Sequence, residues 1–216
     1  MEIALSLVIL IVSIIAHEVA HGYAANALGD PTARYAGRLT LNPIPHIDLM
    51  GSIIIPGLLV LTHSPIFFGW AKPVPYNPHN LKGRWSETIV ASAGVATNFV
   101  IALIFGLIVR FGSTPLATGG TALPETALMI AATITFVNLF LGLFNLIPFP
   151  PLDGFTALRA ALPWHAAQGL YRFEAQMRSV GAASLILFLL LFSYVLAGPF
   201  STLVAWVFTF ITGVAA

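Results

Sequence analysis

An apolar stretch covering residues 3–28 is long enough to cross a lipid bilayer as a helix. Two histidines and a glutamate interrupt it, at His17, Glu18 and His21. Ionisable side chains are costly in hydrocarbon unless they belong to a buried site or face a water-filled cavity. We therefore expect a transmembrane helix that carries a functional site, which restricts the fold to architectures that can bury polar groups at membrane depth.

These three residues have the spacing H-E-x-x-H, which is typical of zinc sites on helices. His17 and His21 lie about one helical turn apart, so both imidazoles can bind one tetrahedral metal ion. Glu18 lies beside them and can act as the general base for an attacking water. The pattern indicates a metal-dependent hydrolase that works within the membrane; the alternative is a chance match of three residues.

A third metal ligand must come from elsewhere, because a catalytic zinc usually has three protein ligands and the chain has no cysteine. The candidates are His46, His63, His79, His165, Glu2, Asp30, Asp48, Glu87, Glu125, Asp153 and Glu174. Asp153 stands out because it follows a proline-rich break at residues 148–151, whose extended backbone needs burial or water at membrane depth. Taken alone, Asp153 and Gly154 can also be read as a turn, or as the N-cap of a short helix.

Two motifs lie far apart in the chain, H-E-V-A-H at residues 17–21 and N-L-I-P-F-P-P-L-D-G at residues 145–154. Together they resemble the site-2 protease family, the intramembrane zinc metalloproteases of peptidase family M50. Shorter similarities lie at residues 41–43, 46–48, 68–75 and 93–98. The resemblance extends over residues 3–159. Val95 and Phe155 stand where the family commonly has proline and glycine, and neither difference removes a metal ligand.

The resemblance implies a role for each motif residue and one Zn²⁺ per chain. The implied residues are His17, His21 and Asp153 as zinc ligands, Glu18 as general base, and Asn145 and Asn98 as groups that stabilise the oxyanion or orient the substrate backbone. The implied activity is hydrolysis of peptide bonds within or near the transmembrane segments of other membrane proteins. Two alternatives remain, a multi-pass protein that binds or transports zinc without proteolysis and a membrane scaffold whose motif is accidental.

Composition agrees with a polytopic membrane protein, since 58% of residues are hydrophobic and only 8% are charged. The candidate spans are residues 3–28, 88–111, 126–147, 180–197 and 200–213. We predict an all-α fold with five to six transmembrane helices around an intramembrane zinc site. Residues 1–216 would form one domain, with a core at 1–160 and C-terminal helices at 165–216. Asn138 is expected to form a hydrogen bond between helices.

Residues 49–70 are apolar but are divided by prolines, and the metal ligands decide how they are placed. His17 and His21 can meet Asp153 only if the chain crosses the membrane an even number of times between them. Two later spans already supply two crossings, so residues 49–70 should be a re-entrant or surface element. Residues 38–41 and 74–76 have short β-like character and can equally be connecting loops.

Basic residues are distributed unevenly in this topology. Of the nine lysines and arginines, only Arg110 falls on the side opposite the site. The positive-inside rule then predicts a plasma-membrane protein with a cytoplasmic active site and an external N-terminus. The net charge of +1 gives no reason to expect nucleic-acid binding. The expected partners are the lipid bilayer and transmembrane protein substrates. No polar block is long enough for a PDZ or cystathionine-synthase-like domain, so a separate adaptor or an upstream protease would help to select substrates.

Overall fold

The computed structural model describes residues 2–61, 71–112 and 123–215, and within these ranges the protein is helical with no β-strand. The helices are α1 (Glu2–Ala27), α2 (Thr32–Tyr35), α3 (Ile55–Leu61), α4 (Ser86–Gly112), α5 (Glu125–Asn145), α6 (Asp153–Ala161), α7 (Trp164–Val180), α8 (Ala182–Leu191) and α9 (Ala197–Thr212). Two 3₁₀ turns, η1 (Ile44–His46) and η3 (Pro78–Asn80), and two π-helical turns, η2 (Leu49–Ile54) and η4 (Phe192–Leu196), join them. The all-α class predicted from the sequence is confirmed.

The two segments predicted as β-like, residues 38–41 and 74–76, are not strands. The prolines on either side of Val74 remove two backbone donors that a strand would need. The backbone carbonyls here bind a side chain instead. The guanidinium of Arg38 donates to the carbonyl oxygen of Lys72 at 2.6 Å and to that of the next residue at 3.3 Å. Residues 71–77 therefore form an extended strap, which hydrogen bonds from side chains hold in place.

Four segments of the described chain are long and apolar enough to cross a membrane: Ala4–Ala27, Ser86–Gly112, Glu125–Asn145 and Ala183–Thr212. The protein is therefore a multi-pass membrane protein. The prediction of five to six spans is wrong for these residues because it divided the last segment at Gly198 and Pro199. Pro199 lies in the first turn of α9, where a missing N–H is tolerated, and the π turn η4 precedes it, so the helical segment continues.

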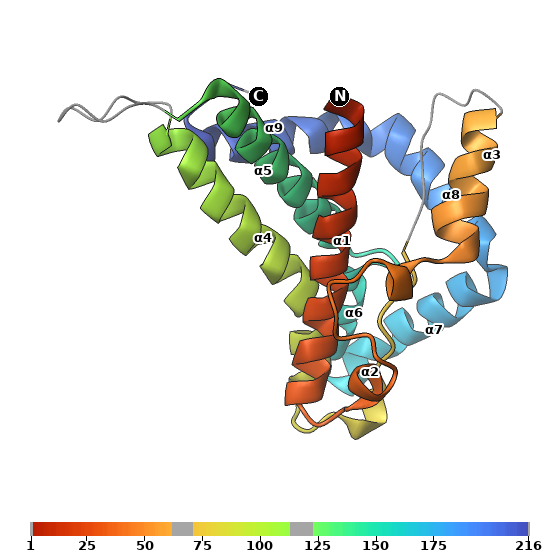
Figure 1. Cartoon of the computed structure of the whole chain (residues 1–216). Helices are drawn as coiled ribbons and strands as arrows, with labels where there is room; N and C mark the ends of the chain where they lie inside the picture. Colours follow the sequence, from red (N-terminus) through yellow and green to blue (C-terminus); the bar gives the residue numbers. More distant parts are fainter. Residues whose placement is uncertain (1, 62–70, 113–122, 216) are drawn as a thin grey trace.

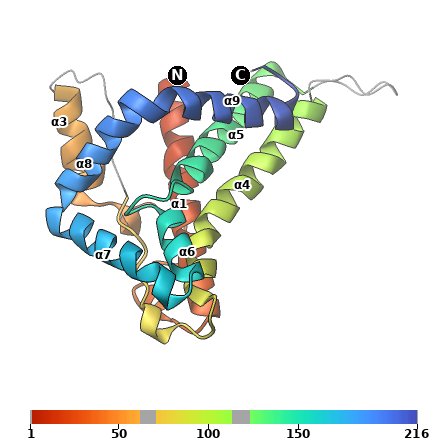
Figure 2. The same cartoon turned by 180° about the vertical axis from the view of Figure 1, so that it is seen from behind.

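The first three spans alternate in direction, as Figure 1 shows. α1 descends from the N-terminus, α4 ascends, and α5 descends again, so the end of α1, the start of α4 and the end of α5 share the lower side with α6 and α7. Two described crossings, α4 and α5, separate the motif histidines from Asp153, and all three lie on one side as the sequence predicts. The view from behind shows α9 running across the upper part of α5 (Figure 2).

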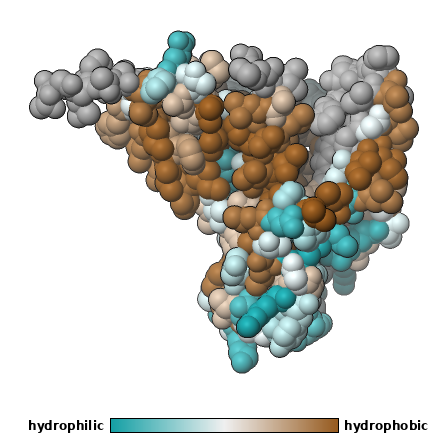
Figure 3. All heavy atoms as spheres, viewed as in Figure 1, coloured by the Kyte–Doolittle hydropathy of each residue, from teal (hydrophilic) through white to brown (hydrophobic). Residues whose placement is uncertain are grey.

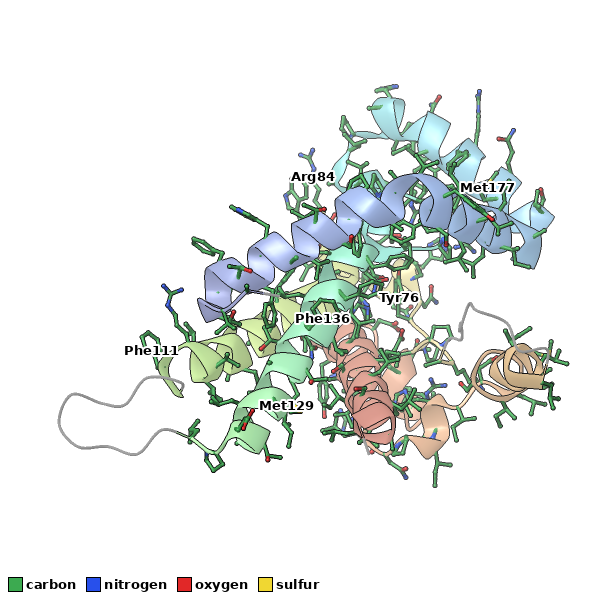
Figure 4. The ribbon with its side chains drawn as sticks, turned by 90° about the horizontal axis from the view of Figure 1, so that it is seen from above. Tyr76, Arg84, Phe111, Met129, Phe136 and Met177 are labelled. Atoms are coloured by element: carbon green, nitrogen blue, oxygen red, sulfur yellow. The ribbon has the colours of Figure 1, made fainter. Side chains whose placement is uncertain are left out.

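α4 is the central helix and packs against α1, α5, α6 and α9. Its Ala102 joins Leu139 of α5 and Val204 and Phe208 of α9 in one fully apolar cluster. Seen from above, Phe136 of α5 lies beside α9, where its ring meets that of Phe208 edge-on with centroids 6.2 Å apart (Figure 4). Such edge-to-face contacts are favourable beyond the area they bury, so α9 is fixed on the α4–α5 pair.

The surface divides into two zones. Apolar side chains cover the upper parts of α1, α4 and α5, and polar residues gather at the lower end (Figure 3). Val8 and Val12 of α1 are more than half exposed, as are Val100 and Ile104 of α4. A soluble protein would bury side chains like these, whereas lipid accepts them.

The described part of residues 49–70 consists of η2 followed by α3. It comprises the 13 residues Leu49–Leu61, which span roughly 20 Å at helical rise and are too short to cross about 30 Å of hydrocarbon. The remainder of this predicted element, residues 62–70, lies outside the described residues. Whether the element re-enters the membrane therefore stays a prediction.

Asp30 ties the loop after α1 to the loop before α4. Its fully buried carboxylate accepts hydrogen bonds from Thr32 Oγ1 at 2.5 Å, the Asn77 backbone N–H at 2.6 Å and Asn80 Nδ2 at 2.8 Å. Burial alone would raise the pKa of Asp30, but these hydrogen bonds outweigh it and lower the pKa. The ionised carboxylate therefore fixes one end of the extended strap beside α1.

Candidate metal centre

Three side chains from two helices converge at one point. His17 and His21 project from α1, and Asp153 lies in the first turn of α6. Asp153 Oδ2 lies 2.9 Å from His17 Nε2 and 3.3 Å from His21 Nε2, and the two nitrogens are 3.0 Å apart. Within the described residues this is the group of three ligand-type side chains close enough to hold a metal ion.

Local structure explains how Asp153 reaches the histidines. Leu152 is the N-cap of α6, so the reading of Asp153 as an N-cap is wrong, and its carboxylate is directed at the imidazoles. Gly154 permits this placement because any Cβ there would overlap the backbone carbonyl of Leu146 at the end of α5. The sequence run that ends in Asp-Gly thus brings the start of α6 against the end of α5.

The protonation pattern of the histidines fits a bound cation. His21 Nδ1 lies 2.7 Å from the backbone carbonyl of Val90, which can only accept, so this nitrogen carries the proton. In neutral His21 the other nitrogen, Nε2, then offers a lone pair toward Asp153. Asp153 Oδ2 is buried and accepts no hydrogen bond. Lone pairs that converge in this way repel one another unless a cation lies between them.

The distances also suit zinc. Ligands bound at about 2.0–2.1 Å in a tetrahedron lie roughly 3.3 Å from one another. The three separations of 2.9, 3.0 and 3.3 Å are within a few tenths of an ångström of that value. Two imidazoles and one carboxylate also match the ligand set of a catalytic zinc that keeps one position open.

Gly94 of α4 makes room for the cluster. A Cβ built on it would overlap His21 Nε2 and would lie 2.6 Å from His17 Nε2. Val90, Gly94 and Asn98 follow one another at four-residue intervals on a single face of α4, and each meets the motif histidines. The spacing of these three residues in the sequence was the available signal that a third helix, α4, lies at the site; from the sequence, Gly94 was recognised only as part of a similarity to the family.

Glu18 is half-buried next to the ligands and is held by the backbone. Its Oε2 accepts a hydrogen bond of 2.9 Å from the N–H of Val74, in the extended strap. No other hydrogen bond in the described residues engages this carboxylate, so its second oxygen remains for a water molecule. The contact between Glu18 and Val74 was not foreseen from the sequence, because it joins residues 56 positions apart.

The two asparagines implied by the family resemblance lie in different surroundings. Asn98 is fully buried, and its Oδ1 is 2.6 Å from His17 Nδ1. Asn145 is half-buried at the end of α5, where its Nδ2 donates to the carbonyl of Leu141 at 3.0 Å. Asn98 is thus directed at a metal ligand, and Asn145 lies just before the proline-rich break.

Several of the other candidate ligands have structural contacts away from the cluster. His46 is buried and its Nε2 meets the carbonyl of Thr40 at 2.9 Å, while Asp48 accepts from the Gly51 N–H at the start of η2. Glu87 and Glu174 both bind Arg159. His63 lies outside the described residues.

Comparisons with known proteins agree with this geometry. A family model described as Peptidase family M50 matches residues 113–189, which include Asp153. The chain is 38% identical over 202 residues to "Putative zinc metalloprotease YwhC" of Bacillus subtilis, covering 91% of this chain and 82% of that protein. The chain belongs to peptidase family M50. It is thus an enzyme of a zinc metalloprotease family, and the recognition made from its two motifs is confirmed.

Other M50 relatives come from mycobacteria. "Putative zinc metalloprotease Rip2" of Mycolicibacterium smegmatis is 31% identical over 201 residues, covering 93% of this chain and 71% of that protein. "Putative zinc metalloprotease Rip3" of Mycobacterium tuberculosis is 37% identical over 73 residues, or 34% of this chain and 17% of that protein. No solved structure matches the chain.

Proposed function

We propose that this M50 protein is an intramembrane zinc metalloprotease that hydrolyses peptide bonds within or near transmembrane segments of other proteins. The observation that carries the proposal is the convergence of His17, His21 and Asp153 beside the carboxylate of Glu18, on helices whose outer faces are apolar. Ligands without a base would serve binding alone, whereas a carboxylate held beside them provides for hydrolysis.

The proposed chemistry assigns one task to each group. Zn²⁺, one per chain, would be held by the three ligands and would polarise the scissile carbonyl and acidify water. Glu18 takes the proton from the attacking water and later delivers it to the leaving amine. The Val74 N–H keeps one oxygen of Glu18 in place during both transfers, which fixes the direction of the other. Asn145, at the end of α5, would orient the substrate backbone.

The substrate segment must lose helical hydrogen bonds before its peptide bonds can be attacked, because amides within a helix are engaged with one another. Water would reach the site beside the proline-rich break after Asn145, on the same side of the bundle as α6 and α7. We place this side in the cytoplasm and the N-terminus outside, since eight of the nine basic residues belong to it. The bilayer is the second partner, and an adaptor or an earlier cleavage by another protease would restrict the choice of substrate.

A reconstitution experiment tests the proposal. Purified protein is placed in phospholipid vesicles with a single-span reporter that carries a fluorescent tag on each side. The same vesicles, loaded with a zinc-sensitive dye, test for a zinc transporter. We expect zinc-dependent cleavage, with the cut mapped by mass spectrometry inside or next to the span, and no accelerated zinc entry. The experiment is repeated with several different single-span reporters. If zinc enters the vesicles and none of these reporters is cleaved, the result favours the transporter and overturns the proposal.

A further inference from the structure

A chain of buried polar side chains leads from the metal centre into the bundle. It contains His17 and Ser13 on α1, Asn98 on α4 and Asn138 on α5, and each is at least nine-tenths buried. Asn98 Oδ1 lies 2.6 Å from His17 Nδ1, and Asn98 Nδ2 donates to Asn138 Oδ1 at 2.8 Å. Hydrogen bonds between side chains thus join three helices.

The far end of this chain fixes the direction of every hydrogen bond in it. Asn138 Nδ2 lies 2.9 Å from the backbone carbonyl of Ile134, which can only accept. The same amide nitrogen donates its second hydrogen to Ser13 Oγ at 2.9 Å. Asn138 must therefore turn its oxygen toward Asn98, and Asn98 must turn its own oxygen toward the ring of His17.

The direction decides which nitrogen of His17 carries the proton. An oxygen that faces Nδ1 requires a hydrogen there, so Nε2 of the neutral ring keeps its lone pair toward Asp153. If these hydrogen bonds ran in the opposite direction, Nδ2 of Asn98 would face Nδ1 of His17. The proton would then lie on Nε2, where it would block metal binding, and the Asn138 oxygen would oppose the Ile134 carbonyl.

We propose that Asn98 and Asn138 form a relay that sets the tautomer and ring orientation of His17 for metal binding. This inference rests on the zinc site of the proposed function. Both residues are positioning residues, since Asn98 acts through His17 and Asn138 acts through Asn98. The role differs from the one implied by the family resemblance, in which Asn98 assists the oxyanion. Asn98 has no exposed surface, and both ends of its amide are already bonded.

The two metal-binding histidines differ in how their orientation is secured. His21 donates to a backbone carbonyl, that of Val90, which is present whatever the side chain at that position. His17 depends on a side chain, so its orientation can be removed by mutation. Partners of this kind typically contribute 10- to 100-fold in metal affinity.

The test measures zinc affinity of the purified full chain in detergent by competition with a chromophoric chelator. Asn98→Leu should bind zinc about 10- to 100-fold more weakly than the wild type. Asn138→Leu should show a smaller loss, because Asn98 keeps its place but not its direction. The double variant should be no weaker than Asn98→Leu alone, because the second residue acts only through the first. Asn98→Asp, which keeps an acceptor for His17, should retain most of the affinity.

Thr135→Val is the matched control. Thr135 is fully buried on α5 near Asn138, and among the described residues its hydroxyl has one hydrogen-bond partner, the Ala131 carbonyl of its own helix. The zinc affinity of the Thr135→Val variant should equal that of the wild type. Normal affinity in Asn98→Leu, or additive losses in the double variant, would overturn the relay. Cleavage is not part of this readout, so wild-type protein that binds zinc but cleaves nothing would instead count against the proposed function.

A second measurement remains informative if Asn98→Leu folds poorly. Histidine labelled with ¹⁵N reports the tautomer directly at a pH where the rings are neutral. The zinc-free protein for this measurement carries Asp153→Ala, because the Asp153 carboxylate would otherwise hold a proton on His17 Nε2 when no cation lies between them. With Asn98 or Asp at position 98 the relay predicts His17 protonated at Nδ1, whereas with Asn138→Leu it predicts a mixture of tautomers. An unchanged single tautomer in Asn138→Leu would contradict the role of Asn138.

Discussion

Replacing Glu18 with glutamine is expected to slow reporter cleavage by about 100- to 10,000-fold, the usual contribution of a general base. Glutamine has the size of glutamate and can still accept the hydrogen bond from the Val74 N–H through its amide oxygen. It cannot take a proton from water at neutral pH. Because no ligand is removed, the zinc content should stay at one per chain. The measurement is the initial cleavage rate in vesicles, together with metal analysis of the same preparation.

Glu125→Gln is the matched control for this change. Glu125 is exposed at the start of α5, on the side opposite the metal centre, and the substitution removes the same charge. Its cleavage rate should equal that of the wild type. Wild-type rates in Glu18→Gln would show that another group acts as the base, and loss of zinc from Glu18→Gln would show that the carboxylate supports the metal.

Replacing Gly94 with alanine is expected to weaken zinc binding by about 100-fold or more, beyond what the loss of one supporting contact costs. The new methyl group would overlap His21 Nε2 and lie 2.6 Å from His17 Nε2, so both imidazoles must move from Asp153. Alanine favours the helix more than glycine does, and α4 itself should therefore persist. Zinc affinity by chelator competition and thermal unfolding of the zinc-free protein separate the two effects.

Gly106→Ala on the same helix provides the comparison. A Cβ there would lie 2.5 Å from the side chain of Ile211 on α9 and 3.3 Å from Thr135 on α5, away from the metal ligands. This variant should lose stability but keep its zinc affinity. Gly94→Ala with normal zinc affinity would mean that the histidines occupy other positions than those described.

Much of the site was predictable because it depends on local rules. The spacing of His17 and His21 requires only helix geometry, and a bilayer allows few other roles for such residues. That the two histidines and Asp153 lie on the same side of the membrane followed from counting the crossings between the first motif and Asp153. Apolar composition likewise predicted long helices whose outer faces meet lipid.

The rest depends on contacts between distant segments, which no local rule supplies. Val74 reaches Glu18 through a strap whose prolines resemble those of an ordinary loop. The family resemblance implied that Asn98 acts on the oxyanion or the substrate backbone. Only the three-dimensional packing shows that its side-chain oxygen faces His17. The last two predicted spans were separated by a proline that the first turn of α9 accommodates. Proline signals a helix boundary on average, and tertiary packing overrides it here.

X-ray absorption at the zinc edge tests the central claim most directly, on purified full-length protein with its metal content measured. One zinc per chain is expected, with two imidazole nitrogens and at least one oxygen at about 2.0–2.2 Å. In His17→Ala the zinc content should fall sharply, and any zinc that remains bound should show at most one imidazole nitrogen. Wild-type protein that binds zinc without imidazole ligands, or that is fully folded and contains no zinc, would contradict the site formed by His17, His21 and Asp153.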